Sequence, residues 1–124
     1  MKDGRMAIDV TLDPAALDRL RELGGVALLS KMIDLFLENT PKRIQAALEG
    51  ERTGNWHEVE RAAHSIKSSA ANLGLAGLRS LAQQVEALAE VEESGPLLPL
   101  LQELEACYPL VRVRLLDERK TLDA

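Results

Sequence analysis

The sequence predicts an all-α protein, an up-down-up-down antiparallel four-helix bundle with an additional short N-terminal helix. Apolar residues make up 46% of the chain but aromatic residues only 2%, a composition that favours packed helices over a β-sandwich. Apolar positions recur at spacings of three and four, as on one face of a helix. Glycine and proline clusters leave short connections, which make successive long helices antiparallel. The 124 residues fit one domain, 1–124, in which residues 1–11 are expected to be a flexible lead-in.

Two helices are predicted in the first half of the chain. Asp13 and Pro14 combine an N-cap acceptor with proline at the first helical position, and they predict a short helix that ends at Gly24-Gly25. A second helix is expected over residues 26–49, and Pro41 should kink it without ending it. Its core stripe is expected to contain Val26, Leu29, Ile33, Phe36, Thr40, Ile44 and Ala47.

A second apolar strip on the 26–49 helix has two interpretations. Leu28, Met32 and Leu35 lie beside the core stripe. They either pack beneath the N-terminal helix or form a docking patch for a partner, since broad apolar faces are common in bundles.

Three further helices are predicted after residue 50. Asn55 caps the third helix, Glu58 three residues later completes a pattern like a capping box, and Gly74 stops the helix. A fourth helix is expected over residues 76–92 and a fifth over 97–119, the latter bent at Pro109. The inward positions of these last two helices are expected to be Leu78, Leu81, Val85, Leu88, Leu100, Leu104, Cys107, Val111 and Leu115.

Composition and motifs exclude several classes of function. The net charge of −5 argues against nucleic-acid binding. The chain has no glycine-rich phosphate loop and no zinc-type Cys/His spacing, so we expect neither a cofactor nor a metal. No apolar run approaches the roughly 20 residues that span a bilayer, and Met1 leads into no apolar signal region. The lone Cys107 is expected to be a small buried hydrophobe in a reducing cytoplasm.

His64 is the outstanding candidate for a functional residue. At about 100° per residue, it lies roughly 130° from the centre of the apolar stripe of its helix and should face water. Ser68 and Ala71, one and two turns onward, are small. A large partner could therefore reach the ring. The stripe itself is predicted to contain Trp56, Val59, Ala63, Ile66, Ala70 and Leu73.

The run Ala63-His64-x-Ile66-Lys67-x-Ser69-x-x-x-x-Gly74 resembles the signature of histidine-containing phosphotransfer (HPt) domains. Segments 35–41, 54–56 and 78–86 extend this resemblance over most of the chain. Ser68 stands where many members carry glycine. The resemblance implies the same helical bundle and a cytoplasmic, monomeric phosphorelay intermediate of a two-component system without autonomous catalysis.

The resemblance also implies partners and residue roles. His64 would carry a phosphoryl group between aspartates of response-regulator receiver domains, which supply the Mg²⁺, and a hybrid sensor histidine kinase is a further candidate partner. Lys67 would offset the phosphoryl charge, and Glu86 would accept Nδ1–H and leave Nε2 free. Either residue could instead be an ordinary surface side chain. Ser68 and Ala71 would form the docking surface.

A non-catalytic helical adaptor is the alternative function. In that case His64 would carry no phosphoryl group, and the strip of Leu28, Met32 and Leu35 would be the main interaction surface. His57, two turns before His64, is expected to be an exposed residue of the first helical turn.

Overall fold

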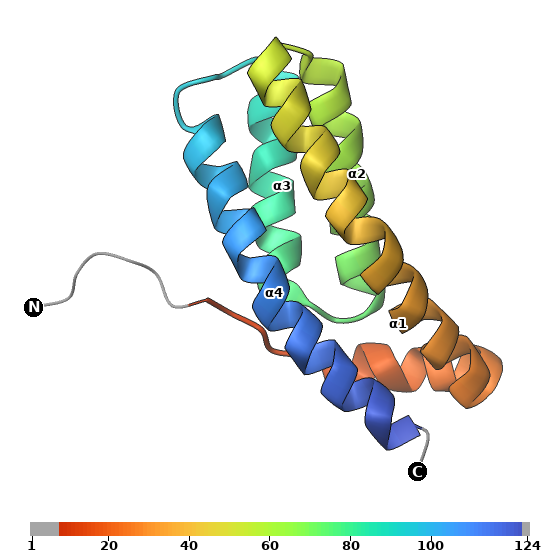
Figure 1. The fold of residues 1–124 in the computed structure, drawn as a ribbon. Coiled ribbons are helices and arrows are strands. Elements are labelled where there is room, and N and C mark those ends of the chain that lie inside the picture. The colour runs from red at the N-terminus through yellow and green to blue at the C-terminus, as the bar shows by residue number, and fades with distance from the viewer. Residues whose placement is uncertain (1–7, 123–124) are drawn as a thin grey trace, which may run out of the picture.

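A computed structural model of the chain describes residues 8–122. It contains four helices: α1 (Pro14–Thr53), α2 (Trp56–Asn72), α3 (Ala76–Glu90) and α4 (Leu97–Leu122). Helix α1 contacts α2 and α4, and α3 contacts the same two helices, so the four helices close into a bundle (Figure 1). The predicted all-α four-helix architecture is confirmed.

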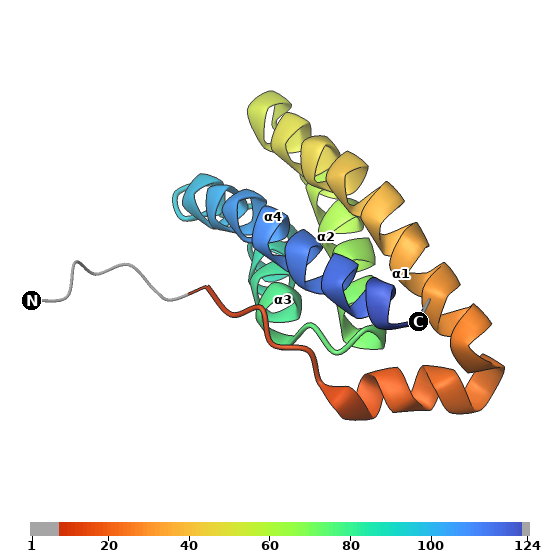
Figure 2. The same cartoon turned by 60° about the horizontal axis from the view of Figure 1, so that its bottom comes forward.

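Helix α1 contains both helices that were expected in the first half of the chain. Its backbone leaves helical geometry at Gly24 (φ −151°) and Gly25 (φ 73°). The segment before this break runs across one end of the bundle, and the segment after it runs along the bundle (Figure 2). Asp13 caps the first segment, because its side chain accepts a hydrogen bond from the Ala15 amide at 3.0 Å. The helix continues through Pro41, as expected.

Val26 is a correction to the predicted core stripe of the second segment. It is 47% exposed because it directly follows Gly25, where the backbone leaves helical geometry and the chain turns. The other six predicted stripe positions of this segment are buried.

Small residues take some of the inward positions that were assigned to leucine. In α3, Ala82 and Ala89 are buried, whereas Leu81 and Leu88 are only partly buried at the edge of the core. In α4, Leu101 is fully buried, and the expected Leu100 lies at the edge. Alanine lets neighbouring helices approach closely. The leucine one position away is then too large for the space between the helices and packs at the edge of the core.

Residues 12 and 13, directly before α1, are attached to the connection between α2 and α3. Leu12 is buried and forms an isolated antiparallel bridge with Leu75. The Asp13 amide donates to the Gly74 carbonyl at 2.9 Å. A side chain at Gly77 would collide with the Asp9 carbonyl, so residues 8–12 lie against the start of α3. The remainder of the predicted lead-in, residues 1–7, lies outside the described residues.

Candidate functional site

His64 lies on the solvent-facing side of helix α2. The Asn55 side chain accepts a hydrogen bond from the Glu58 amide at 3.1 Å and caps the N-terminus, as predicted. Gly74, with φ 70°, follows the C-terminus. The predicted apolar stripe faces the core, and Val59, Ile66 and Leu73 are each at most 1% exposed. His64 therefore lies on the opposite face, where its side chain is 60% exposed.

Glu86 reaches His64 from the neighbouring helix α3. Its Oε2 lies 2.8 Å from His64 Nδ1, and its Oε1 lies 2.6 Å from Lys67 Nζ. The contact expected from the sequence is therefore present. The Glu86 side chain is 14% exposed and that of Lys67 is 27% exposed, so one partly buried carboxylate connects the two side chains.

The charge state of Glu86 determines which ring nitrogen is available. Burial raises the pKa of the Glu86 carboxyl, but hydrogen bonds and charge from Lys67 and His64 outweigh burial and leave the pKa below its ordinary value. An ionised carboxylate can only accept hydrogen bonds, so Nδ1 of His64 carries the proton and donates it. In the neutral ring, Nε2 then carries the lone pair and can act as a nucleophile.

A depression of about 500 Å³ adjoins the His64 ring. It extends toward the N-terminus of α2, because helical side chains lean in that direction. Its lining residues are His57, Glu60, Arg61, His64, Ser65 and Glu86. Arg61 was not singled out from the sequence, although its spacing of three residues before His64 would have indicated it.

The predicted docking residues divide into exposed and packed members. Ser68 and Ala71 are exposed on α2, and Leu35 is 40% exposed. Met32 and Leu28 are partly buried and pack against the core. The strip is therefore divided between two residues that pack against the core and one, Leu35, that is exposed.

A second depression, of about 190 Å³, lies between α1 and α2. Met32 and Leu35 line it from α1, and Ser69 lines it from α2. Part of the strip is thereby brought beside the helix that carries His64.

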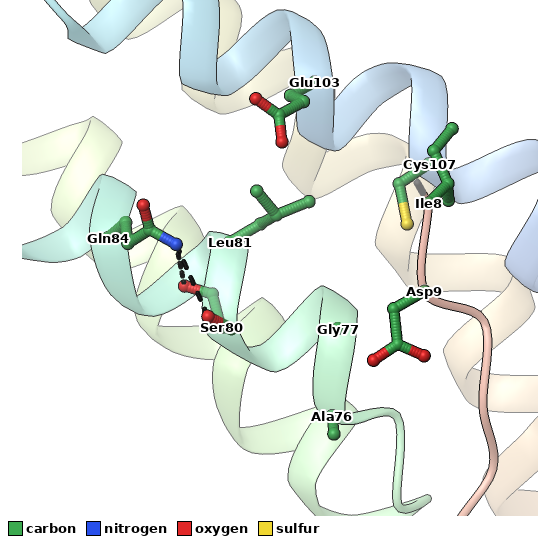
Figure 3. Close-up of a pocket in the computed structure, with 9 residues that line it drawn as sticks. All are labelled: Ile8, Asp9, Ala76, Gly77, Ser80, Leu81, Gln84, Glu103 and Cys107. Atoms are coloured by element: carbon green, nitrogen blue, oxygen red, sulfur yellow. Dashed lines mark hydrogen bonds between the residues drawn. The ribbon is translucent and has the colours of Figure 1, made fainter. Parts of the chain in front are cut away.

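Cys107 lies at a separate cavity of about 240 Å³ between the N-terminal segment, α3 and α4. Figure 3 shows its thiol near Asp9, with Glu103 on the same helix. Burial, and then the charges of these two carboxylates, raise the pKa of the thiol. A protonated, buried thiol is unreactive, which agrees with the prediction of a small buried hydrophobe.

Within residues 8–122, no three or more His, Cys, Asp or Glu side chains are grouped to hold a metal ion. None of the helices in that range has the length and apolarity needed to cross a bilayer.

Comparison with known proteins places this geometry in a family. The family model of the Hpt domain matches residues 31–118. Among solved structures, histidine-containing phosphotransfer protein B from Pseudomonas aeruginosa PAO1 is similar at 23% identity, with a TM-score of 0.82 over 89% of this chain and 95% of that one. That similarity shows a shared fold. A search of the curated proteins finds no match. The chain therefore belongs to the Hpt domain family, whose members are phosphocarriers, and its function is histidine phosphotransfer in a phosphorelay.

Proposed function

We propose that His64 is the phosphorylated residue and that it exchanges its phosphoryl group with aspartates of receiver domains. The observation that carries this proposal is the Glu86 contact at Nδ1. It leaves Nε2 as the nucleophile on a ring that is 60% exposed. Such a ring is accessible to the active site of another protein.

The transfer step balances in bonds and charge. The Nε2 lone pair attacks phosphorus of an aspartyl phosphate, the P–N bond forms, and the P–O bond to the aspartate breaks to release a carboxylate. Nδ1 keeps its proton, so the ring gains positive charge as the bond forms. Glu86 faces that proton and offsets the charge, as a carboxylate does for an imidazolium in hydrolytic triads. Transfer onward to a second aspartate is the reverse reaction.

The remaining chemistry is assigned to the partner. The receiver supplies Mg²⁺ and the acceptor or donor aspartate, and this chain supplies a positioned nucleophile without catalysing a reaction alone. Lys67 adds a positive charge one turn from the ring. Ser68 and Ala71 are small enough for a receiver surface to approach. We further propose that the protein acts as a cytoplasmic monomer, and that a hybrid sensor kinase is one source of the phosphoryl group.

The experiment compares the two histidines of the chain. Wild type, His64→Gln and His57→Gln proteins are incubated with a receiver that carries radiolabelled aspartyl phosphate, and acid-labile label on each protein is measured. We expect His64→Gln to lose labelling and His57→Gln to keep it. Both side chains are exposed, so circular dichroism should show an unchanged fold.

Two outcomes would contradict the proposal. Full labelling of His64→Gln would remove His64 as the acceptor. Absence of label on wild type, tested with a panel of receivers, would favour the adaptor function in its place.

A further inference from the structure

We propose that Arg61 binds the phosphoryl group on Nε2 of His64 and is the principal cation that faces it. This inference rests on the proposed function of His64 and deepens it. It assigns a phosphoryl-binding role to Arg61, whose ion-pair partner within residues 8–122 is Glu58, at 3.8 Å.

The orientation of the ring is the first argument. Nδ1 points at Glu86 on α3, and the two nitrogens of an imidazole point in diverging directions. Nε2 therefore points away from α3. At about 100° per residue, Arg61 lies about 60° from His64 on one side of the helix and Lys67 about 60° on the other. Lys67 contacts Glu86, so Lys67 lies on the side of α2 that faces α3. Arg61 lies on the other side of His64, which is the side toward which Nε2 points.

The lining of the depression is the second argument. Arg61 and His64 line the same depression, whereas Lys67 and Ser68 are not among its lining residues. Helical side chains lean toward the N-terminus, so the His64 ring lies over the turn that contains residues 60 and 61. A phosphoryl group on Nε2 would extend the ring into this space.

The availability of each cation is the third argument. Lys67 Nζ is held by Glu86 at 2.6 Å, and its side chain is 27% exposed. Arg61 is 68% exposed, and its contact with Glu58 is 3.8 Å long, which is worth little in water. Arg61 can therefore leave its partner at small cost, whereas moving Lys67 would strip a partly buried carboxylate of its cation.

The chemistry of the two groups completes the case. A phosphoryl group adds a charge of about −1.5 to −2 and strong acceptor oxygens at neutral pH. Glu60 and Glu86, which line the same depression, would repel it. The planar guanidinium of arginine can donate two parallel hydrogen bonds to phosphate oxygens. Arg61 would then neutralise part of the new charge.

The test follows the phosphorylated protein by NMR. Wild type, Arg61→Ala and Arg61→Lys proteins are phosphorylated with phosphoramidate, a small donor that needs no receiver docking. Arg112→Ala is the matched control, because Arg112 is also an exposed helical arginine but lies on α4. The ³¹P signal of the phosphohistidine is titrated with pH, and the Arg61 side-chain Nε–H signal is recorded before and after phosphorylation. The titration is repeated in His57→Gln protein, because His57 lines the same depression.

A bound cation favours the doubly ionised phosphoryl group. Loss of Arg61 should therefore raise the midpoint of the ³¹P titration by roughly half a pH unit. Arg61→Lys should raise it less, Arg112→Ala should match wild type, and the Arg61 Nε–H signal should shift on phosphorylation. The same midpoint in Arg61→Ala and wild type would overturn this inference, as would equal rises in Arg61→Ala and Arg112→Ala. Absence of phosphohistidine at position 64 would instead overturn the proposed function, so the two failures are distinguishable.

Discussion

Oε2 of Glu86 lies 2.8 Å from Nδ1 of His64, across the contact between α3 and α2. The two residues are 22 positions apart, and the turn at Gly74 brings their helices side by side in antiparallel orientation. The orientation of the His64 ring therefore depends on a side chain from another helix. We therefore expect the phosphotransfer chemistry of the site to be sensitive to residue 86.

Two replacements of Glu86 should distinguish its role in orienting the His64 ring from the effect of its negative charge. Glu86→Ala removes the acceptor for Nδ1–H. Because a hydrogen bond to a charged group contributes about 1.5–3 kcal/mol, the rate of phosphoryl acceptance should fall by about 10- to 100-fold. Glu86→Gln keeps a carbonyl acceptor and should lie between Glu86→Ala and wild type. Transfer rates from a phosphorylated receiver measure both effects. Equal rates in Glu86→Ala and wild type would contradict the orienting role.

The lowered pKa of Glu86 also predicts how stability depends on pH. The unfolded chain takes up the proton at the ordinary value of 4.5, whereas the folded protein takes it up only at lower pH. Ionised Glu86 therefore contributes its full stabilisation at pH values above 4.5, the pKa of the unfolded chain. This stabilisation is lost as the pH falls through the lower pKa of the folded protein. The difference in free energy of unfolding between wild type and Glu86→Gln should be larger at pH 7 than at pH 3 in urea titrations.

Lys67→Ala provides the control for this pH dependence. Lys67 is one of the two groups whose interactions lower the pKa of Glu86. In a Lys67→Ala background, the difference in free energy of unfolding between the protein with Glu86 and the Glu86→Gln variant should vary less between pH 7 and pH 3. If the free-energy difference between wild type and Glu86→Gln does not change with pH, the lowered pKa of Glu86 in the folded protein is contradicted.

Ser68 tests the direction from which the receiver approaches. Its side chain is exposed one turn beyond His64. Ser68→Trp should block transfer sterically while the melting temperature stays near wild type. Ser68→Gly should preserve transfer and cost about 1 kcal/mol of stability, as glycine does in a helix interior. If Ser68→Trp accepts phosphate at the wild-type rate from a receiver, the partner does not dock over this face.

Gly74 should be intolerant of any side chain. Its φ is 70°, and an added Cβ would lie 2.9 Å from the Cβ atoms of Asp13 and Ala16. Gly74→Ala should therefore lower the free energy of unfolding by about 2–4 kcal/mol, through a left-handed backbone and overpacking. Gly54 is the matched control, because its φ is 74° but nothing lies within 4 Å of the added atom. Gly54→Ala should cost only the backbone component, about 1–2 kcal/mol. Similar losses in both variants would contradict the packing argument.

Thr40 should be a site of easy stabilisation. It is 0% exposed, and its hydroxyl has no hydrogen-bond partner. A buried, unpaired hydroxyl costs about 1–3 kcal/mol, so Thr40→Val should raise the free energy of unfolding by about 1 kcal/mol. Thr53 is the contrasting control, because its hydroxyl donates to the Glu49 carbonyl at 2.9 Å. Thr53→Val should not stabilise the protein. A loss of stability in Thr40→Val would show that the hydroxyl is satisfied in solution.

Local sequence features are enough to predict the helices and the face on which His64 lies. Helix limits follow from local chemistry: the caps at Asp13 and Asn55 and the left-handed glycines at 25 and 74 act within a few residues. The exposure of His64 follows from the period of its own helix. These features need no knowledge of distant contacts.

The assembly of the site depends on how the helices pack against one another. The motif suggested Glu86, but only the antiparallel packing of α2 and α3 brings its two carboxylate oxygens to His64 and Lys67. Val26 was assigned to the core, because periodicity could not show that the corner at Gly25 turns it outward. The role proposed for Arg61 also depends on the ring orientation that Glu86 imposes from another helix. Periodicity reports which way one helix faces, whereas the distance between side chains on two helices depends on how those helices pack.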